Sequence, residues 1–313
     1  MPEQVRHDGP GMTERGDRIP IAILVRLGSA LGISTMNALV KLAEARGAAL
    51  PEILFFRQAV SVPVLAALIA AGPGLASVRT RRIGAHAVRA ASGTAGMLLL
   101  FAAVTLLPLA QATTLTFSVP IFATILGALW LGEPTGWHRW GAVAAGFAGV
   151  VIVAHPWDGR FAPLGTACGL GYAVTTALVS IQLRQIGRTE APMTTVFWFA
   201  TLSTPVLAAF YLLAAQRHPP LVWALLVGIG LVGSLTQLAL TGSLRLAPVS
   251  VVVPMDYAQL VWATLYGWAL FGALPAATTW IGAPAIVGSG LYIVWREHVR
   301  RREVTRGIAG EAS

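Results

Sequence analysis

Long apolar blocks recur along the chain from residue 20 to residue 295. Within a block the apolar residues are nearly continuous and lack the strict alternation that marks a strand of a membrane β-barrel. About 20 helical residues cross the roughly 30 Å hydrocarbon core of a bilayer. The pattern predicts ten transmembrane helices, of which the fifth is short: 20–40, 50–71, 87–107, 109–131, 138–154, 161–182, 194–215, 220–241, 247–270 and 277–295.

The composition supports a membrane protein and excludes an ordinary soluble globule. Hydrophobic residues make up 56% of the 313 positions and charged residues only 11%, with a mean hydropathy of +0.70. Soluble domains carry about 25% charged residues. We therefore expect an all-α integral membrane protein whose backbone polar groups are satisfied within helices.

Two polar tails flank the predicted spans. Residues 1–18 are mixed in charge, and the apolar block that follows has no small-residue cleavage site at the distance a signal peptide requires, so the first helix is expected to stay.

Cys168 is the single cysteine and can form no intrachain disulfide. We interpret it as a small buried apolar residue.

The distribution of arginine and lysine predicts the orientation. With a cytoplasmic N-terminus, 16 of the 22 basic residues fall on the cytoplasmic side and four on the other, while Arg26 and Arg57 lie within helices. The positive-inside rule then places both termini in the cytoplasm. The basic clusters flank spans, so the net charge of +9 is explained by topology and anionic lipid, and nucleic acid is not an expected partner.

The chain also repeats itself. Ser61 and residues 63–67 recur as Ser203 and residues 205–209, an offset of 142. Gly32 matches Gly171, and Pro134, Gly141 and Gly149 match Pro275, Gly282 and Gly290, at offsets of 139 and 141. We predict a tail over 1–18, a first five-helix repeat over 19–155, a second over 160–295 and a tail over 296–313. Because five is odd, the second repeat should be inverted, which is a basis for alternating access.

The residues of the first repeat resemble a known family. The run Leu131, Gly132, Glu133 and Pro134, followed by Gly141 and Gly149, is similar to the EamA type of the drug/metabolite transporter superfamily, as are Phe55, Phe56 and Arg57. The resemblance covers roughly residues 20–295. It implies a ten-helix carrier, often an exporter of amino acids or related metabolites, with no cofactor and no ATP site. Leu274 stands where the second repeat would carry the counterpart of Glu133, so no role is transferred to that position.

Ionisable residues within spans each require a reason, because a charge at a helix centre costs about 2.5–3.5 kcal/mol on insertion scales. Asp256 lies near the middle of the ninth predicted span, with Gln259 on the same helix face. Asp256 either faces a central cavity, where it binds a substrate ammonium group or takes up a proton, or pairs with an arginine of a neighbouring helix. Arg57 either captures a substrate carboxylate or has a structural role, and Arg26 is long enough to reach the interface.

Neutral polar residues form single stripes at helical spacing. Such stripes either line a wet path or make hydrogen bonds between helices. The bulky amide side chains favour a wet path more than the hydroxyl side chains do. The candidate substrate-binding residues are Asn37 in span one, Gln111 and Thr114 in span four, Tyr172 in span six and Gln237 in span eight, together with Arg57, Asp256 and Gln259.

Aromatic and proline residues add two further hypotheses. Most tryptophans lie near span ends, as in an interfacial belt, but Trp198 lies deeper and could stack on a ligand or pack in the core. Pro120 and Pro254 could kink or hinge spans four and nine.

The sequence predicts a secondary transporter in the plasma (inner) membrane. It lacks a phosphate-binding G-x-x-x-x-G-K-[ST] loop, a zinc-spaced His/Cys set and a G-x-S-x-G elbow, so neither ATP-driven transport nor common hydrolytic chemistry has support. Resemblance narrows the substrate to exported amino acids or small metabolites. The alternatives are export of cationic drug-like compounds, an intramembrane enzyme and a receptor-like role without flux.

Overall fold

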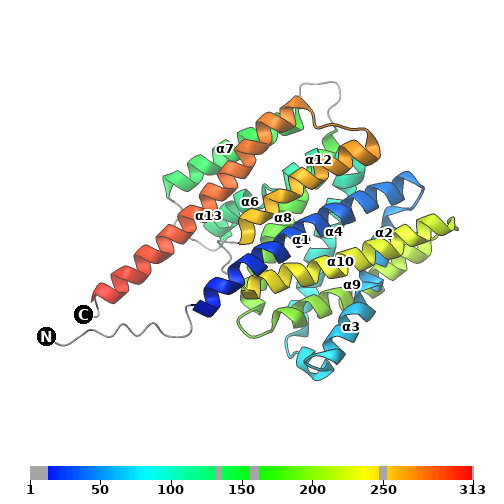
Figure 1. Ribbon diagram of the computed structural model, residues 1–313, viewed down its shortest axis with the longest axis horizontal. Coiled ribbons are helices and arrows are strands. Elements are labelled where there is room, and N and C mark those ends of the chain that lie inside the picture. Colours follow the sequence, from blue (N-terminus) through cyan, green and yellow to red (C-terminus); the bar gives the residue numbers. More distant parts are fainter. Residues whose placement is uncertain (1–12, 131–135, 156–161, 247–251, 312–313) are drawn as a thin grey trace.

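The computed structural model describes residues 13–130, 136–155, 162–246 and 252–311, and these residues are helical apart from short connections. Figure 1 shows the helices packed side by side. The elements are α1 (Thr13–Ala45), α2 (Leu50–Ala59), α3 (Ser61–Ala71), η1 (Leu75–Val78), α4 (Ile83–Leu106), α5 (Leu109–Thr116), α6 (Val119–Trp130), α7 (Trp137–Ala154), α8 (Pro163–Ile186), α9 (Pro192–Ala214), α10 (Pro220–Leu246), η2 (Val253–Tyr257), α12 (Ala258–Phe271) and α13 (Ala277–Glu311).

Nine segments of the described chain are long and apolar enough to cross a membrane. They coincide with the predicted spans except the ninth, 247–270. Part of that span lies outside the described residues, and the rest is η2 followed by the 14-residue α12. The motif Leu131–Pro134 also lies outside the described residues.

Three of the predicted spans are interrupted rather than continuous. Span two is divided at Val60 into α2 and α3, and span four ends as α5 at Thr116 and resumes as α6 at Val119. Pro120 is therefore the second residue of α6, a position where the missing N–H disrupts no helical hydrogen bond. Pro254 lies in the 3₁₀ turn η2 ahead of α12. Both prolines thus mark helix breaks.

Close pairs of helices build the body of the molecule: α1 packs on α10, α4 on α8, α7 on α13 and α2 on α9. Small residues allow these approaches. A Cβ on Gly149 of α7 would lie 2.8 Å from the carbonyl oxygen of Gly282 on α13, and one on Gly32 of α1 would overlap the Thr236 hydroxyl on α10. These glycines were noticed in the sequence as repeat positions, and here they set the spacing between helices.

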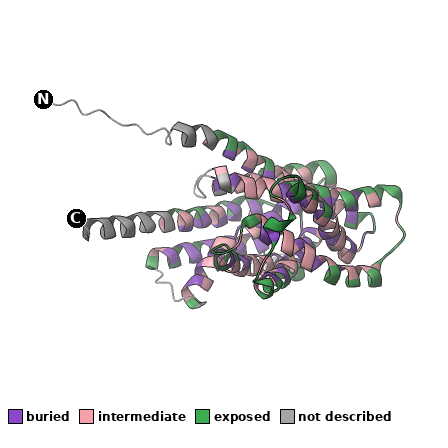
Figure 2. Ribbon diagram, turned by 90° about the horizontal axis from the view of Figure 1, so that it is seen from below, coloured by how far each residue is buried: buried purple, intermediate pink, exposed green. Residues whose placement is uncertain are grey.

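The outer surface is apolar. Leu212 and Leu213 of α9 are 75% and 88% exposed, and Leu24 of α1 and Leu129 of α6 are also exposed. Figure 2 shows exposed residues on the outward faces of helices and buried ones between them. Such leucines would be costly in water and are suited to lipid. The protein is thus a multi-pass membrane protein.

Polar side chains fasten helix ends inside the bundle. The Nζ of Lys41 on α1 donates to the carbonyl oxygens of Val104, Thr105 and Leu107, at 2.9, 3.2 and 2.7 Å, at the end of α4. These are carbonyls that the helix itself leaves unpaired. The start of α1 and the end of α13 lie at the same end of the molecule (Figure 1).

Candidate functional site

A cavity of about 280 Å³ lies between α1, α2, α4, α8, α9 and α10, and we call it the central cavity. Its volume lies just below the roughly 300–1,000 Å³ of ligand pockets. Apolar residues such as Met36 and Met97, and the rings of Phe101 and Phe199, form much of its wall. Its polar lining consists of Arg57, Arg89, Ser92, Tyr172, Thr175, Thr176 and Gln237.

The central cavity brings together three of the residues singled out in the sequence, which are Arg57, Tyr172 and Gln237. They come from α2, α8 and α10, three helices far apart in the chain. No aspartate or glutamate occurs among the lining residues that the structure describes. The cavity therefore offers cationic and neutral hydrogen-bond donors and aromatic faces, but no carboxylate.

Arg57 is held against the cavity wall by a polar cluster. Its Nη1 donates to Gln58 Oε1 at 2.7 Å and to Ser61 Oγ at 3.3 Å. Ser61 in turn receives a hydrogen bond of 2.8 Å from the Ser234 hydroxyl of α10. Gly233 of α10 leaves the space that Arg57 fills, because a Cβ there would lie 2.9 Å from Nε.

Arg89 is a cavity residue that was not among the predicted site residues, because it was counted only as a basic residue at the cytoplasmic end of the span 87–107. The helix α4 starts at Ile83, so Arg89 lies inside it and faces the cavity. Its guanidinium carbon lies 4.4 Å from the centroid of the Phe199 ring of α9, a cation–π arrangement. Gly93, one helical turn further on, makes room for both side chains, because a Cβ there would overlap Arg89 Nη1 and lie 2.8 Å from Phe199 Cε2.

Asp256 lies in an ion pair with Arg26 of α1, one of the two arrangements expected from the sequence. Arg26 Nε donates to Asp256 Oδ1 at 2.6 Å, and Nη2 bonds to the other carboxylate oxygen. Arg26 is only 5% exposed and does not reach an interface. The neighbouring Gln259 is buried, and its backbone oxygen accepts a hydrogen bond of 3.1 Å from Ser34.

The remaining neutral candidates lie away from the central cavity. Gln111 lines a separate cavity of about 320 Å³ near the start of α5, where its Nε2 donates to the Val153 carbonyl at 3.0 Å. Thr114 is fully buried and donates to the Ala110 carbonyl of its own helix at 2.8 Å. Asn37 is buried in α1, and its Oδ1 has no partner among the described residues.

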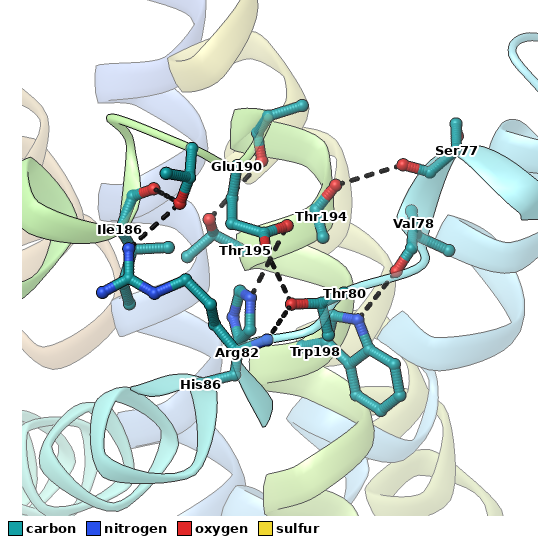
Figure 3. A network of polar contacts seen from close by, with 12 residues as sticks. Ser77, Val78, Thr80, Arg82, His86, Ile186, Glu190, Thr194, Thr195 and Trp198 are labelled. Atoms are coloured by element: carbon teal, nitrogen blue, oxygen red, sulfur yellow. Dashed lines mark hydrogen bonds and ion pairs between the residues drawn. The ribbon is translucent and has the colours of Figure 1, made fainter. Parts of the chain in front are cut away.

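Trp198 belongs to a polar network that joins the α3–α4 connection to the α8–α9 connection (Figure 3). Its indole N–H donates to the Val78 carbonyl at 2.8 Å. Nearby, the Thr80 hydroxyl donates to Glu190 Oε1 at 2.7 Å, and Arg82 Nη1 donates to the Thr189 hydroxyl at 3.0 Å. We call this set the α8–α9 network. Trp198 thus fastens a connection, and it is not among the lining residues of the central cavity.

His86 is the buried centre of the α8–α9 network. It is fully buried on α4, its Nε2 lies 4.0 Å from Glu190 Oε2, and neither ring nitrogen has a hydrogen-bond partner among the described residues. Figure 3 shows its ring beneath Glu190, beside Arg82 and Thr80.

A second glutamate fastens the opposite end of the bundle. Glu52 of α2 is fully buried and accepts hydrogen bonds from the backbone N–H groups of Ala49 and Gln216, at 2.8 and 3.0 Å. Its Oε2 lies 2.8 Å from His218 Nε2, in the α9–α10 connection. Each end of the bundle thus has a glutamate that joins the first half of the chain to the second.

Comparison with known families accounts for this architecture. The EamA-like transporter family matches residues 20–154 and, a second time, residues 163–295. The chain belongs to the EamA-like transporter family. The relationship predicted from the residues of the first repeat is therefore confirmed, and the protein is a transporter of the drug/metabolite type rather than an intramembrane enzyme.

Individual relatives carry small metabolites. The chain is 35% identical over 240 residues to a riboflavin transporter of Vibrio cholerae, covering 74% of this chain and 78% of that protein. It is 28% identical over 275 residues to the pseudopaline exporter CntI of Pseudomonas aeruginosa, covering 87% and 95%. The relatives are therefore transporters of different metabolites, and the family does not by itself give the substrate.

A solved structure shares the fold. A chain of known crystal structure superimposes with a TM-score of 0.57 at 22% identity, over 87% of this chain and 96% of that one. At this identity the likeness concerns the arrangement of helices only.

Proposed function

We propose that the protein is a secondary transporter that moves a small organic metabolite by alternating access through the central cavity. In this proposal the two family segments, 20–154 and 163–295, are inverted repeats that rock against each other. The packing is in keeping with two structurally equivalent halves. Span 1 (α1) packs on span 8 (α10), and span 3 (α4) packs on span 6 (α8). Because spans 1 and 3 of the first repeat correspond to spans 6 and 8 of the second, these two contacts are equivalent.

The proposed orientation of the protein in the membrane follows from the basic residues. We place the protein in the inner membrane with both termini in the cytoplasm, as the excess of arginine on that side favours. The α8–α9 network then lies at the cytoplasmic end of the cavity and the Glu52–His218 contact at the opposite end.

The lining of the central cavity favours a planar metabolite with hydrogen-bond acceptors. Phe199 and Tyr172 offer aromatic rings, while Gln237 and the two arginines offer donors. A flavin combines a fused ring system with carbonyl acceptors, and a relative at 35% identity is a riboflavin transporter. Riboflavin is therefore our first candidate substrate, and the observation that carries it is the combination of rings and donors around one cavity.

The same lining disfavours the other candidates. An amino acid or a cationic drug-like compound brings a positive charge, for which a carboxylate is the usual partner. The described cavity lining has none, and Asp256 is engaged by Arg26. Amino-acid export, the activity that the family resemblance implied, becomes the second candidate.

The test is flux into and out of proteoliposomes that contain the purified protein. Riboflavin is followed by its fluorescence, with and without a pH gradient, beside radiolabelled amino acids and a quaternary ammonium compound. We expect saturable riboflavin flux. Uptake into empty vesicles and efflux from loaded vesicles are compared. Flux of an amino acid or of the cation, with no riboflavin flux, would contradict the flavin assignment.

A matched pair of variants connects that flux to the cavity. Gln237→Leu removes an amide of the lining at similar volume, and losing one hydrogen bond predicts about a tenfold higher KM. Gln185→Leu makes the same change on an exposed face of α8 and should leave KM unchanged. Equal effects of the two substitutions on KM would show that the central cavity is not part of the transport path.

A further inference from the structure

Two partly buried arginines line the central cavity, and neither has a counter-ion among the described residues. Arg57 Nε and Arg89 Nε and Nη1 are buried atoms that have no hydrogen-bond partner among the described residues. Neither arginine is in an ion pair within the part of the chain that the structure describes. A buried charge without a partner is costly, so each position needs an explanation.

The rest of the bundle shows how this protein treats a buried cation that has a structural role. Arg26 is paired with Asp256, and Lys41 is surrounded by three carbonyl oxygens at the end of α4. Both groups have their donors occupied by fixed acceptors. Arg57 and Arg89 differ because both line one cavity and part of their donor set has no acceptor among the described residues.

Both guanidinium groups are also positioned. Gln58 and Ser61 hold Arg57 Nη1, and the Phe199 ring lies against Arg89. Gly233 and Gly93 keep the space for them free of side chains. Donors fixed in this way lose little conformational entropy when they bind an acceptor.

We infer that Arg57 and Arg89 form an anion-recognition site in the wall of the central cavity, which binds a carboxylate or phosphate group, so that an anionic solute binds more tightly than its neutral analogue. The inference rests on the proposed transport through the central cavity and adds an anion subsite to it. Guanidinium groups match both oxyanions with two N–H donors each, and bonds between charged partners are about twice as strong as neutral ones. The bound anion supplies the counter-charge that the empty cavity lacks.

Flavins provide a matched probe pair for this site. Riboflavin and riboflavin 5′-phosphate share the ring system and differ by one dianionic group. Quenching of flavin fluorescence by the purified protein measures the affinity for each. We expect the 5′-phosphate to bind about tenfold more tightly, as one or two charged hydrogen bonds predict.

Five substitutions locate the effect. Arg57→Gln and Arg89→Gln should each remove the preference for the phosphate, measured as the ratio of the affinities for the two flavins in the same variant. Arg81→Gln removes the same charge from an exposed position of the α3–α4 connection and should keep the preference. Arg57→Lys and Arg89→Lys keep the charge and should retain part of the preference for the phosphate. Equal affinity for the two flavins in the wild-type protein, or a preference that survives both Gln variants, would overturn the inference.

A second measurement separates this inference from the choice of a flavin. Inorganic phosphate, exchanged for chloride at constant ionic strength, should raise the Tm of the wild-type protein but not of Arg89→Gln. If phosphate stabilises the protein while neither flavin binds, the anion site stands and the flavin assignment fails. If riboflavin is transported while phosphate neither stabilises the protein nor competes, the anion site fails and the transport proposal stands.

Discussion

Arg26 and Asp256, 230 residues apart in the chain, form a two-pronged ion pair that fastens α1 to the turn η2. Arg26 also lies within reach of Ser243 and the Leu240 carbonyl, at 3.4 and 3.5 Å on α10. The pair therefore joins three elements around the start of α12. Its arrangement indicates a structural role, because the carboxylate is already occupied.

A first prediction concerns this pair. Asp256→Asn leaves the Arg26 charge buried without its counter-ion and should lower the free energy of unfolding by about 3 kcal/mol or more. The double variant Arg26→Met with Asp256→Leu removes both charges and should recover most of that loss. Thermal unfolding measures both. Transport per folded molecule should stay within about threefold in the double variant, since the central cavity keeps its lining.

The opposite pattern would restore the alternative function for Asp256. A fully stable Asp256→Asn protein with no flux would mean that the carboxylate acts on substrate or proton. The same pattern in the double variant would support that conclusion independently.

Much of the fold could be predicted from the sequence because block length alone determines which segments can cross a bilayer. The helices α4, α8 and α13 contain nearly all residues of the predicted spans 87–107, 161–182 and 277–295. The sequence also showed that an ionisable side chain at position 256 requires an explanation, because the cost of removing a charge from water can be recognised without knowing its partner. The partner itself, Arg26, depends on the packing of α1 against η2, which no local pattern contains.

The candidate site was predicted only in part, for a comparable reason. Helical spacing placed Tyr172 and Gln237 on polar faces, and Arg57 was singled out as an ionisable residue within a span. The structure brings all three to one cavity. Arg89 was missed because an arginine close to a span end resembles a loop residue. Gly93 was the available hint, since a small residue one turn away leaves room on the same face. Trp198 was expected either to stack on a ligand or to pack in the core, and in the structure its indole N–H donates to the Val78 carbonyl.

A second prediction tests the space beside Arg89. Gly93→Ala introduces a methyl group that overlaps the guanidinium and the Phe199 ring, so both side chains must shift into the cavity. We expect transport to fall about tenfold or more, because small misplacements of binding groups are costly. Gly84→Ala, on the same helix, has nothing within 4 Å of the new methyl and serves as the control. Similar flux in both variants would show that Arg89 is not positioned by this contact.

A third prediction concerns the α8–α9 network. For the cavity to open at that end, the hydrogen bond between Thr80 and Glu190 and its neighbours must separate. Glu190→Ala removes the acceptor of the Thr80 hydroxyl and should raise the fraction of open molecules severalfold, as the loss of about 1–2 kcal/mol predicts. The readout is labelling of a cysteine placed at Leu100 in the cavity, in a Cys168→Ala background, by an impermeant maleimide added to inverted vesicles.

The control for that labelling is Arg188→Ala. Arg188 is exposed in the same connection, and no contact ties it to α4 in the described part of the chain. Its labelling rate should equal that of the parent. A Glu190→Ala protein that labels no faster than Arg188→Ala would show that the network does not restrain opening.

The last prediction concerns the other end of the bundle, where Glu52 gathers three donors. Glu52→Ala leaves the N–H groups of Ala49 and Gln216 and the His218 ring without their acceptor in a buried setting. Bonds to a charged group are worth about 1.5–3 kcal/mol each, so we expect a loss of about 3 kcal/mol after partial rehydration. Glu44→Ala removes an exposed glutamate near the same end and should change stability by no more than about 0.5 kcal/mol. Thermal unfolding of the two variants side by side decides the matter: equal Tm values would mean that Glu52 does not hold α2 to the α9–α10 connection.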